Sequence, residues 1–474
     1  MLKYNFLKVK IVSLFLFGVI SSCATKAQMS EGLKPNWDNM QKIIDQVKEP
    51  VFPNKTFSIA DFGAVSDGKF DNTQVFKKAI QACSQNGGGM VLVPAGKYFT
   101  GPIHLESNLN LHLEEGAEIL FSTNPKDFPI VHTSFEGTEL MNYSPLIYAY
   151  QKSNVAVTGK GVLNGQAKNE NWWSWCGKDV YGWKKGDPVQ NVKRLMDMGE
   201  QGVAVEDRVF GEGYYLRPNF IEFFDCKNVM LKGVKIVDAP FWIIHPIKAT
   251  NVIIDGVFIQ SHGPNNDGCD PEYSKNVIIR NCSFNTGDDC IAIKSGRDND
   301  GRRVGIASEN IVVQNCKMFD GHGGVTMGSE ISSGVKNVYV ENCEMDSPEL
   351  DRAIRIKTNT RRGGTTENVF VRNLTIGQVK ESVLGIDMFY SFHGNQTGNF
   401  IPQVKNIYIE NVTVKNGGKY GILAKGLKES PIKNIVFKNV TIDKVETKYS
   451  LQNVENLQFF NTKMNGAQIE TPTN

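Results

Sequence analysis

The sequence predicts an all-β fold, a right-handed parallel β-helix in which the chain winds through stacked coils. The first observation is a repeat that returns from about residue 225 onward, at steps of 22 to 38 residues. The second is that each copy alternates apolar and polar residues around an Asn or Gly bend, as strands interrupted by a tight corner do. The third is that no copy shows a helical period. Because such a unit cannot bury its apolar face alone, the copies must stack on one another.

The repeat also predicts a recurring side chain. Each copy begins with Asn, and one coil per copy would place these residues about 4.8 Å apart, as a ladder at one corner. For a single copy the preference of Asn for turns is almost as good an explanation, but it is a poor one for eight copies. The copies start at Asn228, Asn251, Asn276, Asn310, Asn337, Asn368, Asn406 and Asn434, with a degraded copy at Asn456.

The N-terminal residues predict export. A basic start precedes an apolar run that is too short to span a bilayer, which is typical of a secretory signal peptide. Cys23 follows two small residues and favours a lipoprotein signal over residues 1–23, with a lipid anchor at Cys23; ordinary cleavage near "ATKAQ" is the alternative. We therefore expect an exported protein, either periplasmic or anchored to the outer membrane of a Gram-negative bacterium.

The rest of the chain predicts one domain. Residues 24–55 form an N-terminal extension, residues 56–466 a single β-helix, and residues 467–474 a frayed tail. Within the β-helix we expect a helix from about Asn72 to Cys83 that caps the first coil, and a long Trp-rich loop inserted at about 165–216. The formal net charge of +2 gives no reason to expect a nucleic acid as partner.

Eight cysteines follow Cys23, and five of them lie in or beside strand-like runs. A free cysteine in such a run packs as a small apolar side chain, so we expect mostly free, buried thiols. No spacing resembles a zinc site, and we expect no metal ion and no cofactor.

Charged groups fall at matching positions of consecutive copies. Gly287-Asp288 lies 11 and 12 residues after Asn276, and Gly321-His322 lies 11 and 12 residues after Asn310. Asp267 precedes Asp288 by 21 residues, which is about one coil. The resulting column spans roughly 14 Å, the reach of a few sugar rings. It contains Asp267, then Asp288 with Asp289, then His322, then Arg355 with Lys357.

Three carboxylates in so small a space cannot all ionise easily. At least one should have a raised pKa and be able to donate a proton near neutral pH. Glycoside hydrolysis has this requirement, because one carboxyl protonates the leaving oxygen while a second activates water. Taken alone, Asp288-Asp289 is better explained as a turn satisfied by backbone N–H groups. The matching positions of Asp267 and His322 favour the catalytic interpretation.

Four short motifs carry a resemblance to a known family. They are "NND" at 265–267, "GDD" at 287–289, "GHG" at 321–323 and "RIK" at 355–357. In this order on a β-helix they resemble the polygalacturonase family of pectin-degrading glycoside hydrolases, family 28. One departure is Asn266, where the family usually has Thr. The resemblance covers most of the mature chain.

The resemblance implies a role for each motif. Asp288 would be the general acid, while Asp267 and Asp289 would hold and deprotonate the attacking water. His322 would orient the acid or the sugar, and Arg355 with Lys357 would bind a galacturonate carboxylate. The family inverts the anomeric carbon in a single displacement, for which we expect roughly 6.5 to 9.5 Å between acid and base.

Further residues are candidates for substrate binding. His262 and Asn265 lie next to the column in sequence. Arg297, Arg302 and Arg303 belong to a glycine-bounded loop, and arginine suits bidentate binding of uronate carboxylates. A solvated turn is the alternative for this loop. The tryptophans at 172, 173 and 175 could stack on sugars or could fix the inserted loop to the body.

The sequence therefore predicts a monomeric hydrolase that acts on a pectic poly- or oligosaccharide of cell walls. Because the inserted loop could close one end of the groove, we expect exo-action. A calcium-dependent polysaccharide lyase and a non-catalytic glycan-binding β-helix are the alternatives. The three aspartates and the lack of a credible calcium loop disfavour the lyase.

Overall fold

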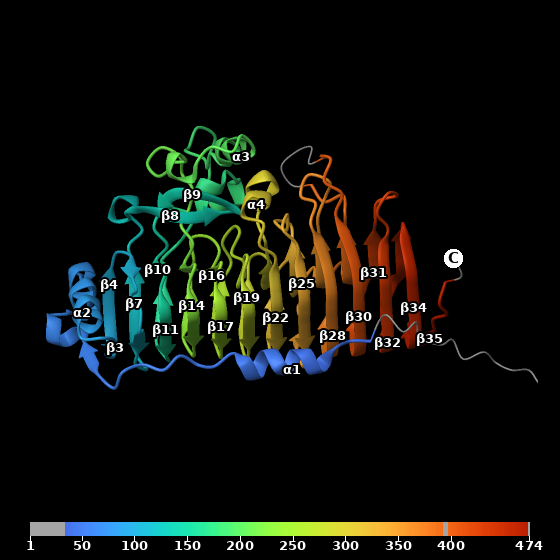
Figure 1. Cartoon of the computed structure of the whole chain (residues 1–474), viewed down its shortest axis with the longest axis horizontal. Helices are drawn as coiled ribbons and strands as arrows, with labels where there is room; N and C mark the ends of the chain where they lie inside the picture. Colours follow the sequence, from blue (N-terminus) through green and yellow to red (C-terminus); the bar gives the residue numbers. More distant parts are fainter. Residues whose placement is uncertain (1–33, 392–396, 473–474) are drawn as a thin grey trace, which may run out of the picture. The chain divides into compact units, whose positions relative to one another are not determined.

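The computed structural model describes residues 34–391 and 397–472. The chain divides into residues 1–34 and a compact unit of residues 35–474, which contains all the described helices and strands. In this unit the chain winds as a right-handed parallel β-helix, which confirms the predicted fold class (Figure 1). Strands of successive coils pair in parallel and form three columns.

Each column collects strands from successive coils in chain order. The first column contains β1 (Thr56–Ser58), β3 (Gly89–Val93), β6 (Leu109–Leu113), β11 (Ser153–Gly159), β14 (Lys227–Lys232), β17 (Thr250–Asp255), β19 (Lys275–Arg280), β22 (Ser308–Gln314), β25 (Val335–Glu341), β28 (Thr365–Gln378), β30 (Gln403–Asn416), β32 (Ile432–Ile442) and β34 (Val454–Met464). The second column contains β2 (Asp67–Asp71), β4 (Gly96–Thr100), β7 (Ala117–Phe121), β12 (Val162–Asn164), β15 (Lys235–Val237), β18 (Phe258–Ser261), β20 (Ser283–Thr286), β23 (Lys317–Asp320) and β26 (Glu344–Met345), and it merges with the first at β28. The third column contains β5 (Ile103–His104), β10 (Ile147–Tyr150), β13 (Ile221–Phe224), β16 (Ile244–Ile247), β21 (Ile291–Ile293), β24 (Val325–Gly328), β27 (Arg352–Lys357), β29 (Ser382–Asp387), β31 (Gly418–Lys425) and β33 (Val445–Gln452).

The third column is interrupted at one coil. Between β16 and β21 the chain contributes only isolated bridges, at Cys269 and Glu272. Cys269 pairs with Ile244 on one side and Ile291 on the other, so the stacking of the coils continues through the gap.

The asparagine ladder is confirmed. The leading Asn of each copy from Asn228 to Asn456 has a left-handed backbone, with φ between 56° and 60°. Its amide group donates a hydrogen bond to the leading Asn of the preceding coil, at 2.8 to 3.2 Å. Asn tolerates this conformation because its short polar side chain bonds locally. The ladder is longer than the repeat predicts, since it continues through Asn154 to Asn108.

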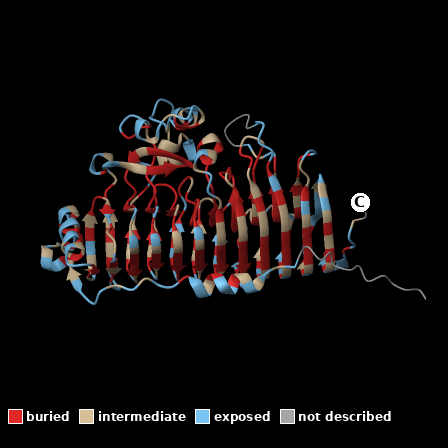
Figure 2. Ribbon diagram, in the orientation of Figure 1, coloured by how far each residue is buried: buried red, intermediate tan, exposed pale blue. Residues whose placement is uncertain are grey.

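Buried residues recur along the strands of all coils (Figure 2), and the buried apolar residues of successive coils form one continuous core. Seven of the eight described cysteines are buried and all eight are free, which confirms the expectation for the thiols. Cys282, Cys316 and Cys343 occupy the same position in three successive coils, as the register of β20, β23 and β26 requires. Each is at most 1% exposed.

The N-terminal end is capped as predicted. Helix α2 (Thr73–Gln85) buries its apolar face, including Phe76 and Ile80, over the first coil. A second helix, α1 (Trp37–Gln46), lies within the predicted extension, where no helix was predicted, and it runs along the strand columns (Figure 1). The Trp37 indole N–H donates to Glu410 at 3.0 Å, and the Arg372 guanidinium lies 4.0 Å from the centre of a Trp37 ring.

Two additions cover one side of the third column. The first, which the sequence did not predict, is an antiparallel hairpin of β8 (Ile130–Phe135) and β9 (Thr138–Tyr143). The second is the inserted segment at 165–216, which folds into short helices rather than an open loop. The short helices of the unit are η1 (Ile59–Phe62), η2 (Pro125–Asp127), η3 (Trp173–Cys176), η4 (Asp179–Tyr181), η5 (Val205–Asp207), α3 (Val192–Glu200) and α4 (Asp298–Val304).

The tryptophans of the inserted segment fix it to the body. Trp172 is fully buried, and the Trp173 indole N–H donates to the carbonyl of Ala239 at 2.8 Å. Trp175 packs edge-on against Trp172. The structure therefore favours the anchoring interpretation of these residues over sugar stacking.

The C-terminal end departs from prediction. The residues after Gly466 do not simply fray, because β35 (Ala467–Gln468) folds back antiparallel onto β34. Ile469 is 6% exposed and packs against the last coil. The predicted signal peptide and Cys23 lie outside the described residues. No helix in the described part of the chain has both the length and the apolarity to cross a membrane.

Candidate active site

The predicted column of charged residues lies where the chain enters the third column of strands. Register pairs Cys269 with Ile291, Ile291 with Val325, and Val325 with Ile354, so four coils stack directly here. These coils carry Asp267; Asp288 and Asp289 before β21; His322 before β24; and Arg355 with Lys357 in β27. The structure thus brings together all six residues of the predicted column.

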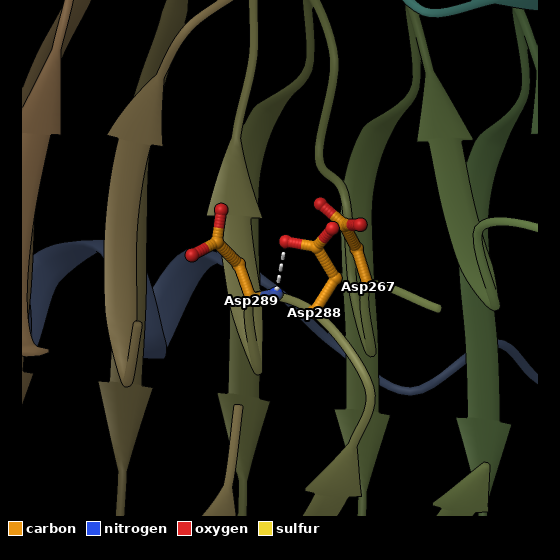
Figure 3. A group of neighbouring side chains, drawn as sticks. All are labelled: Asp267, Asp288 and Asp289. Atoms are coloured by element: carbon orange, nitrogen blue, oxygen red, sulfur yellow. Dashed lines mark hydrogen bonds between the residues drawn. The ribbon is translucent and has the colours of Figure 1, made fainter. Parts of the chain in front are cut away.

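The three aspartates lie side by side (Figure 3). Asp267 and Asp288 line a pocket, whereas Asp289 is fully buried and does not line it. One oxygen of each of Asp267, Asp288 and Asp289 lies within 4.8 Å of the others. The backbone N–H of Asp289 donates to the Asp288 carboxylate at 2.9 Å, which fixes the two neighbours relative to each other. The spacing is shorter than the roughly 6.5 to 9.5 Å that we expected between acid and base. It therefore does not by itself indicate an inverting reaction.

Asp289 is held in its ionised form. Its carboxylate is fully buried and receives the Lys357 ammonium at 2.7 Å, the Arg355 guanidinium at 3.3 Å and the Thr326 hydroxyl at 3.0 Å. Burial opposes ionisation, but the charges of Lys357 and Arg355 outweigh it and lower the pKa of Asp289. Asp289 is therefore ionised, as a proton acceptor must be, but its carboxylate is enclosed and does not line the pocket.

Asp288 forms a hydrogen bond with His322. The Asp288 carboxylate lies 3.0 Å from Nδ1 of His322. Burial opposes the ionisation of Asp288, but the hydrogen bond and charge of His322 lower its pKa. The same hydrogen bond raises the pKa of His322 to about 9. In the free protein, the proton of this pair therefore resides on the imidazole.

The raised pKa belongs to Asp267. Burial, and then the charge of Asp288, raise the pKa of Asp267 to about 7. At least one carboxyl has a raised pKa, as predicted, although burial contributes more than the crowding of carboxylates. The raised group is Asp267 and not Asp288, the residue to which the resemblance assigns the acid role. Sequence spacing could not show this, because it depends on which carboxylate His322 contacts.

Five charged side chains that were not predicted also line the pocket: Glu136, Lys178, Lys294, Glu330 and Arg362. Lys294 had a usable signal. Ala292-Ile293-Lys294 matches the spacing of Arg355-Ile356-Lys357, and in register Lys294 stands two coils before Lys357. Glu136 had no such signal, because it lies in the turn of the hairpin β8–β9.

Of the three predicted arginines, one reaches the pocket. Arg297 lines it but is 5% exposed and forms ion pairs with Glu136 at 3.0 Å and Glu330 at 2.9 Å. Arg302 and Arg303 do not line it. The Arg302 guanidinium lies 3.4 Å from the centre of the Phe400 ring and also bonds to backbone carbonyls, while Arg303 pairs with Asp300. Both belong to helix α4 rather than to a solvated loop.

Asn265 and His262 also differ in position. The Asn265 side chain lines the pocket and accepts a hydrogen bond from Arg217 at 2.8 Å. His262 lines a neighbouring hollow instead, where its Nε2 lies 3.2 Å from Asp320. His322 and Tyr181 border both spaces, so the hollow continues from the pocket.

The three carboxylates are spaced closely enough to hold a metal ion. However, their oxygens already contact the ammonium groups of Lys294 and Lys357 and the guanidinium of Arg355. These cations compensate the negative charge that would attract a metal ion. The residues therefore suit proton transfer better than metal binding, and the absence of a metal requirement stays a prediction.

Comparisons with known proteins are consistent with this geometry. The family model for glycosyl hydrolases family 28 matches residues 212–464, which include every residue of the predicted column. The model described as "Rhamnogalacturonase A/epimerase, pectate lyase-like" matches residues 56–117.

Individual proteins are also similar to this chain over most of its length. A crystal structure of a hyperthermoactive exopolygalacturonase from Thermotoga maritima is 44% identical, covers 92% of this chain and 98% of its own, and superposes with a TM-score of 0.89. A probable polygalacturonase from Vitis vinifera is 27% identical over 81% of this chain and 74% of its own length. An exo-poly-alpha-D-galacturonosidase from Dickeya chrysanthemi is 26% identical over 76% of this chain and 62% of its own length.

Proposed function

The chain belongs to glycosyl hydrolases family 28, and we propose that it hydrolyses α-linked galacturonate from the ends of pectic chains with inversion of the anomeric carbon. The observation that carries this proposal is the cluster of Asp267, Asp288 and Asp289 at a pocket lined by the first two of them and by the cations of Arg355 and Lys357. The carboxylates supply the acid and the base, and the cations attract a negatively charged uronate.

The base side of the reaction uses Asp289 and Asp267. Asp289 is ionised because Lys357 and Arg355 compensate its charge, so it accepts a proton from the attacking water. Asp267 holds the same water. Because the three carboxylates lie within 4.8 Å of one another, the water sits beside them rather than in a wide gap between acid and base.

The acid side uses Asp288 with His322. The proton on the His322 imidazole passes to Asp288 when substrate enters, because the sugar excludes water and its carboxylate adds negative charge, both of which raise the pKa of Asp288. Asp288 then protonates the leaving oxygen. The 3.0 Å hydrogen bond between the two residues provides the path.

Exo-action is supported by the closed end of the pocket. Glu136, Arg297 and Glu330 line the pocket and form a continuous chain of buried ion pairs, which we infer to close one end of the groove. A polysaccharide cannot pass these buried groups, so only its terminal residue fits. The sequence pointed instead to the inserted segment at 165–216 for this closure, but that segment contributes only Lys178 and Tyr181 to the lining. The hollow beyond His322 leaves room for the remainder of the chain.

The test is product analysis on polygalacturonan, beside the Asp288→Asn variant. We expect galacturonate monomer as the early product, with an inverted anomer, and almost no product from the variant. Early oligomers of mixed length would contradict exo-action. Unsaturated, ultraviolet-absorbing products would indicate a lyase, and no product from any pectic polymer would favour a glycan-binding protein.

We also propose that the protein is exported and anchored by a lipid at Cys23 and acts as a monomer. The sequence of residues 1–23 supports the first point. Mass spectrometry of the mature N-terminus tests it, since an acylated Cys23 and a processed residue beyond it differ in mass. Light scattering on the purified protein tests the oligomeric state.

A further inference from the structure

Lys294 is a buried cation directly behind the catalytic carboxylates. The residue is 3% exposed, and its Nζ lies 3.4 Å from Asp267, 3.2 Å from Glu330 and 3.5 Å from Asp270. On its other side the ammonium lies 4.3 Å from the centre of a Trp242 ring. Four groups from three coils thus converge on one ammonium.

The neighbours of Lys294 compete for its charge. Asp270 is fully buried, and among the described residues Lys294 is the only cation that pairs with it. Burial raises the pKa of Asp270 well above its usual value, which keeps this carboxyl protonated. Glu330 differs, because Arg297 and Arg362 also pair with it, and it stays ionised. The charged groups competing at Lys294 are therefore Asp267 and Glu330.

We propose that Lys294 is a positioning residue whose ammonium holds the carboxylate of Asp267 for water activation and ties it to Glu330 at the closed end of the pocket. It acts through Asp267 and makes no bond to the substrate. The proposal rests on the proposed function, because it presumes that Asp267 holds the attacking water.

The charge of the Lys294 ammonium affects the pKa of Asp267, and this effect can be measured. Burial and the charges of Asp288 and Asp289 raise the pKa of Asp267, whereas Lys294 and then Lys357 lower it. Without Lys294, Asp267 would ionise only at higher pH. Without the charge of Glu330, more of the ammonium's field would act on Asp267, which would ionise at lower pH. The two changes thus predict opposite shifts of the pH below which the enzyme loses activity.

The experiment measures kcat and KM on galacturonan oligosaccharides across pH for four variants. In Lys294→Met we expect the acid-side limb of the pH profile of kcat to move to higher pH by about one unit or more. At a given pH on that limb, kcat would then be about tenfold lower. In Glu330→Gln we expect the limb to move down. In Lys294→Arg, which keeps the charge, we expect the limb to stay near that of the wild type. Lys433→Met is the matched control, since Lys433 is an exposed lysine in β32, and we expect no shift.

The outcomes separate this inference from the proposed function. If the wild type releases no galacturonate, the proposed function fails. If the wild type is active but the limb of a folded Lys294→Met variant stays in place, the inference about Lys294 is wrong. A rise in KM with unchanged kcat would also overturn it, because that would indicate direct substrate binding. If Lys294→Met does not fold, the direction of the Glu330→Gln shift decides, and a shift upward or none rejects the inference.

Discussion

Two corners of the same coils differ in whether successive coils carry the same residue. At the corner where the first column begins, successive coils carry the same residue, such as Asn276, Asn310 and Asn337, each bonded to the one before. At the corner that leads into the third column, the same coils carry Asp288, His322 and the strand of Arg355. The ladder repeats one residue because every coil needs the same turn. The active site uses a different residue on each coil, and the stacking sets their separation.

The two corners also differ in how charge is managed. The ladder is neutral, and each amide both donates and accepts along the column. The active site buries carboxylates that cost free energy unless cations pair with them. Changes at the ladder should therefore reduce stability and spare the rate, whereas changes at the site should reduce the rate and disturb local charge.

The largest expected effect is on the rate. Asp289→Asn keeps the shape of the side chain but removes the base, so kcat should fall by about 10²- to 10⁴-fold. Steady-state kinetics on galacturonan oligosaccharides measure this, and thermal unfolding shows whether the fold is intact. A folded variant with more than a tenth of the wild-type kcat would contradict the role of Asp289.

The next effect concerns the buried charge itself. Lys357→Met leaves the Asp289 carboxylate with Arg355 as its remaining direct cation, and should lower the free energy of unfolding by about 3 kcal/mol. The double variant Lys357→Met/Asp289→Asn should recover most of this loss, because it removes the unpaired charge. Urea unfolding of both variants tests this, and equal losses in the two would contradict it.

A pH effect follows from a second buried cluster, under the hairpin β8–β9. His245 lies fully buried between Glu222 at 3.3 Å and Glu272 at 2.9 Å. Burial opposes its protonation, but the two carboxylates outweigh it and raise the pKa of His245 to about 9. Because the folded pKa lies above the unfolded value of 6.5, this contribution is fully present below pH 6.5 and is lost as pH rises through about 9. The loss should be roughly 3 kcal/mol.

Urea unfolding from pH 6 to pH 10 measures this loss. In His245→Gln the decline in stability over that range should be smaller than in the wild type. An equally steep decline in both proteins would show that other groups cause it.

The smallest expected effect is at the ladder. Asn276→Ala removes two amide hydrogen bonds and forces Ala into a left-handed backbone with φ of 57°, at a cost of about 2 kcal/mol. Asn276→Gly removes the same bonds without the backbone strain and should cost less. Because Asn276 lies on the coil of Asp288, unchanged kcat in both variants would support the division between the two corners. A large loss of kcat in either variant would contradict this division between the two corners.

The sequence was most informative where the molecule repeats itself. The leading Asn predicted the ladder and the coil length, and the coil length placed Asp267, Asp288 and His322 on neighbouring turns. The same periodicity could have identified Lys294, because Lys294 follows Ile293 in its coil as Lys357 follows Ile356 two coils later.

Features outside the repeat were not predictable in this way. Glu136 lies in a hairpin turn far from the motifs in sequence, and its position depends on how that hairpin folds over the third column. Arg302 and Arg303 had the right chemistry for uronates, but packing against Phe400 and Asp300 turns them away from the pocket. Protonation also depends on contacts: only the structure shows that His322 bonds to Asp288, so that the raised pKa falls on Asp267.

The column of free cysteines provides a built-in reporter of how the solenoid opens. Of the eight described thiols, only that of Cys176, in the inserted segment, is partly accessible. A thiol reagent should label this cysteine at once and reach Cys282, Cys316 and Cys343 only when their coils separate. The rate of this slow labelling, measured for each peptide by mass spectrometry, would then report how often individual coils separate, without any engineered probe.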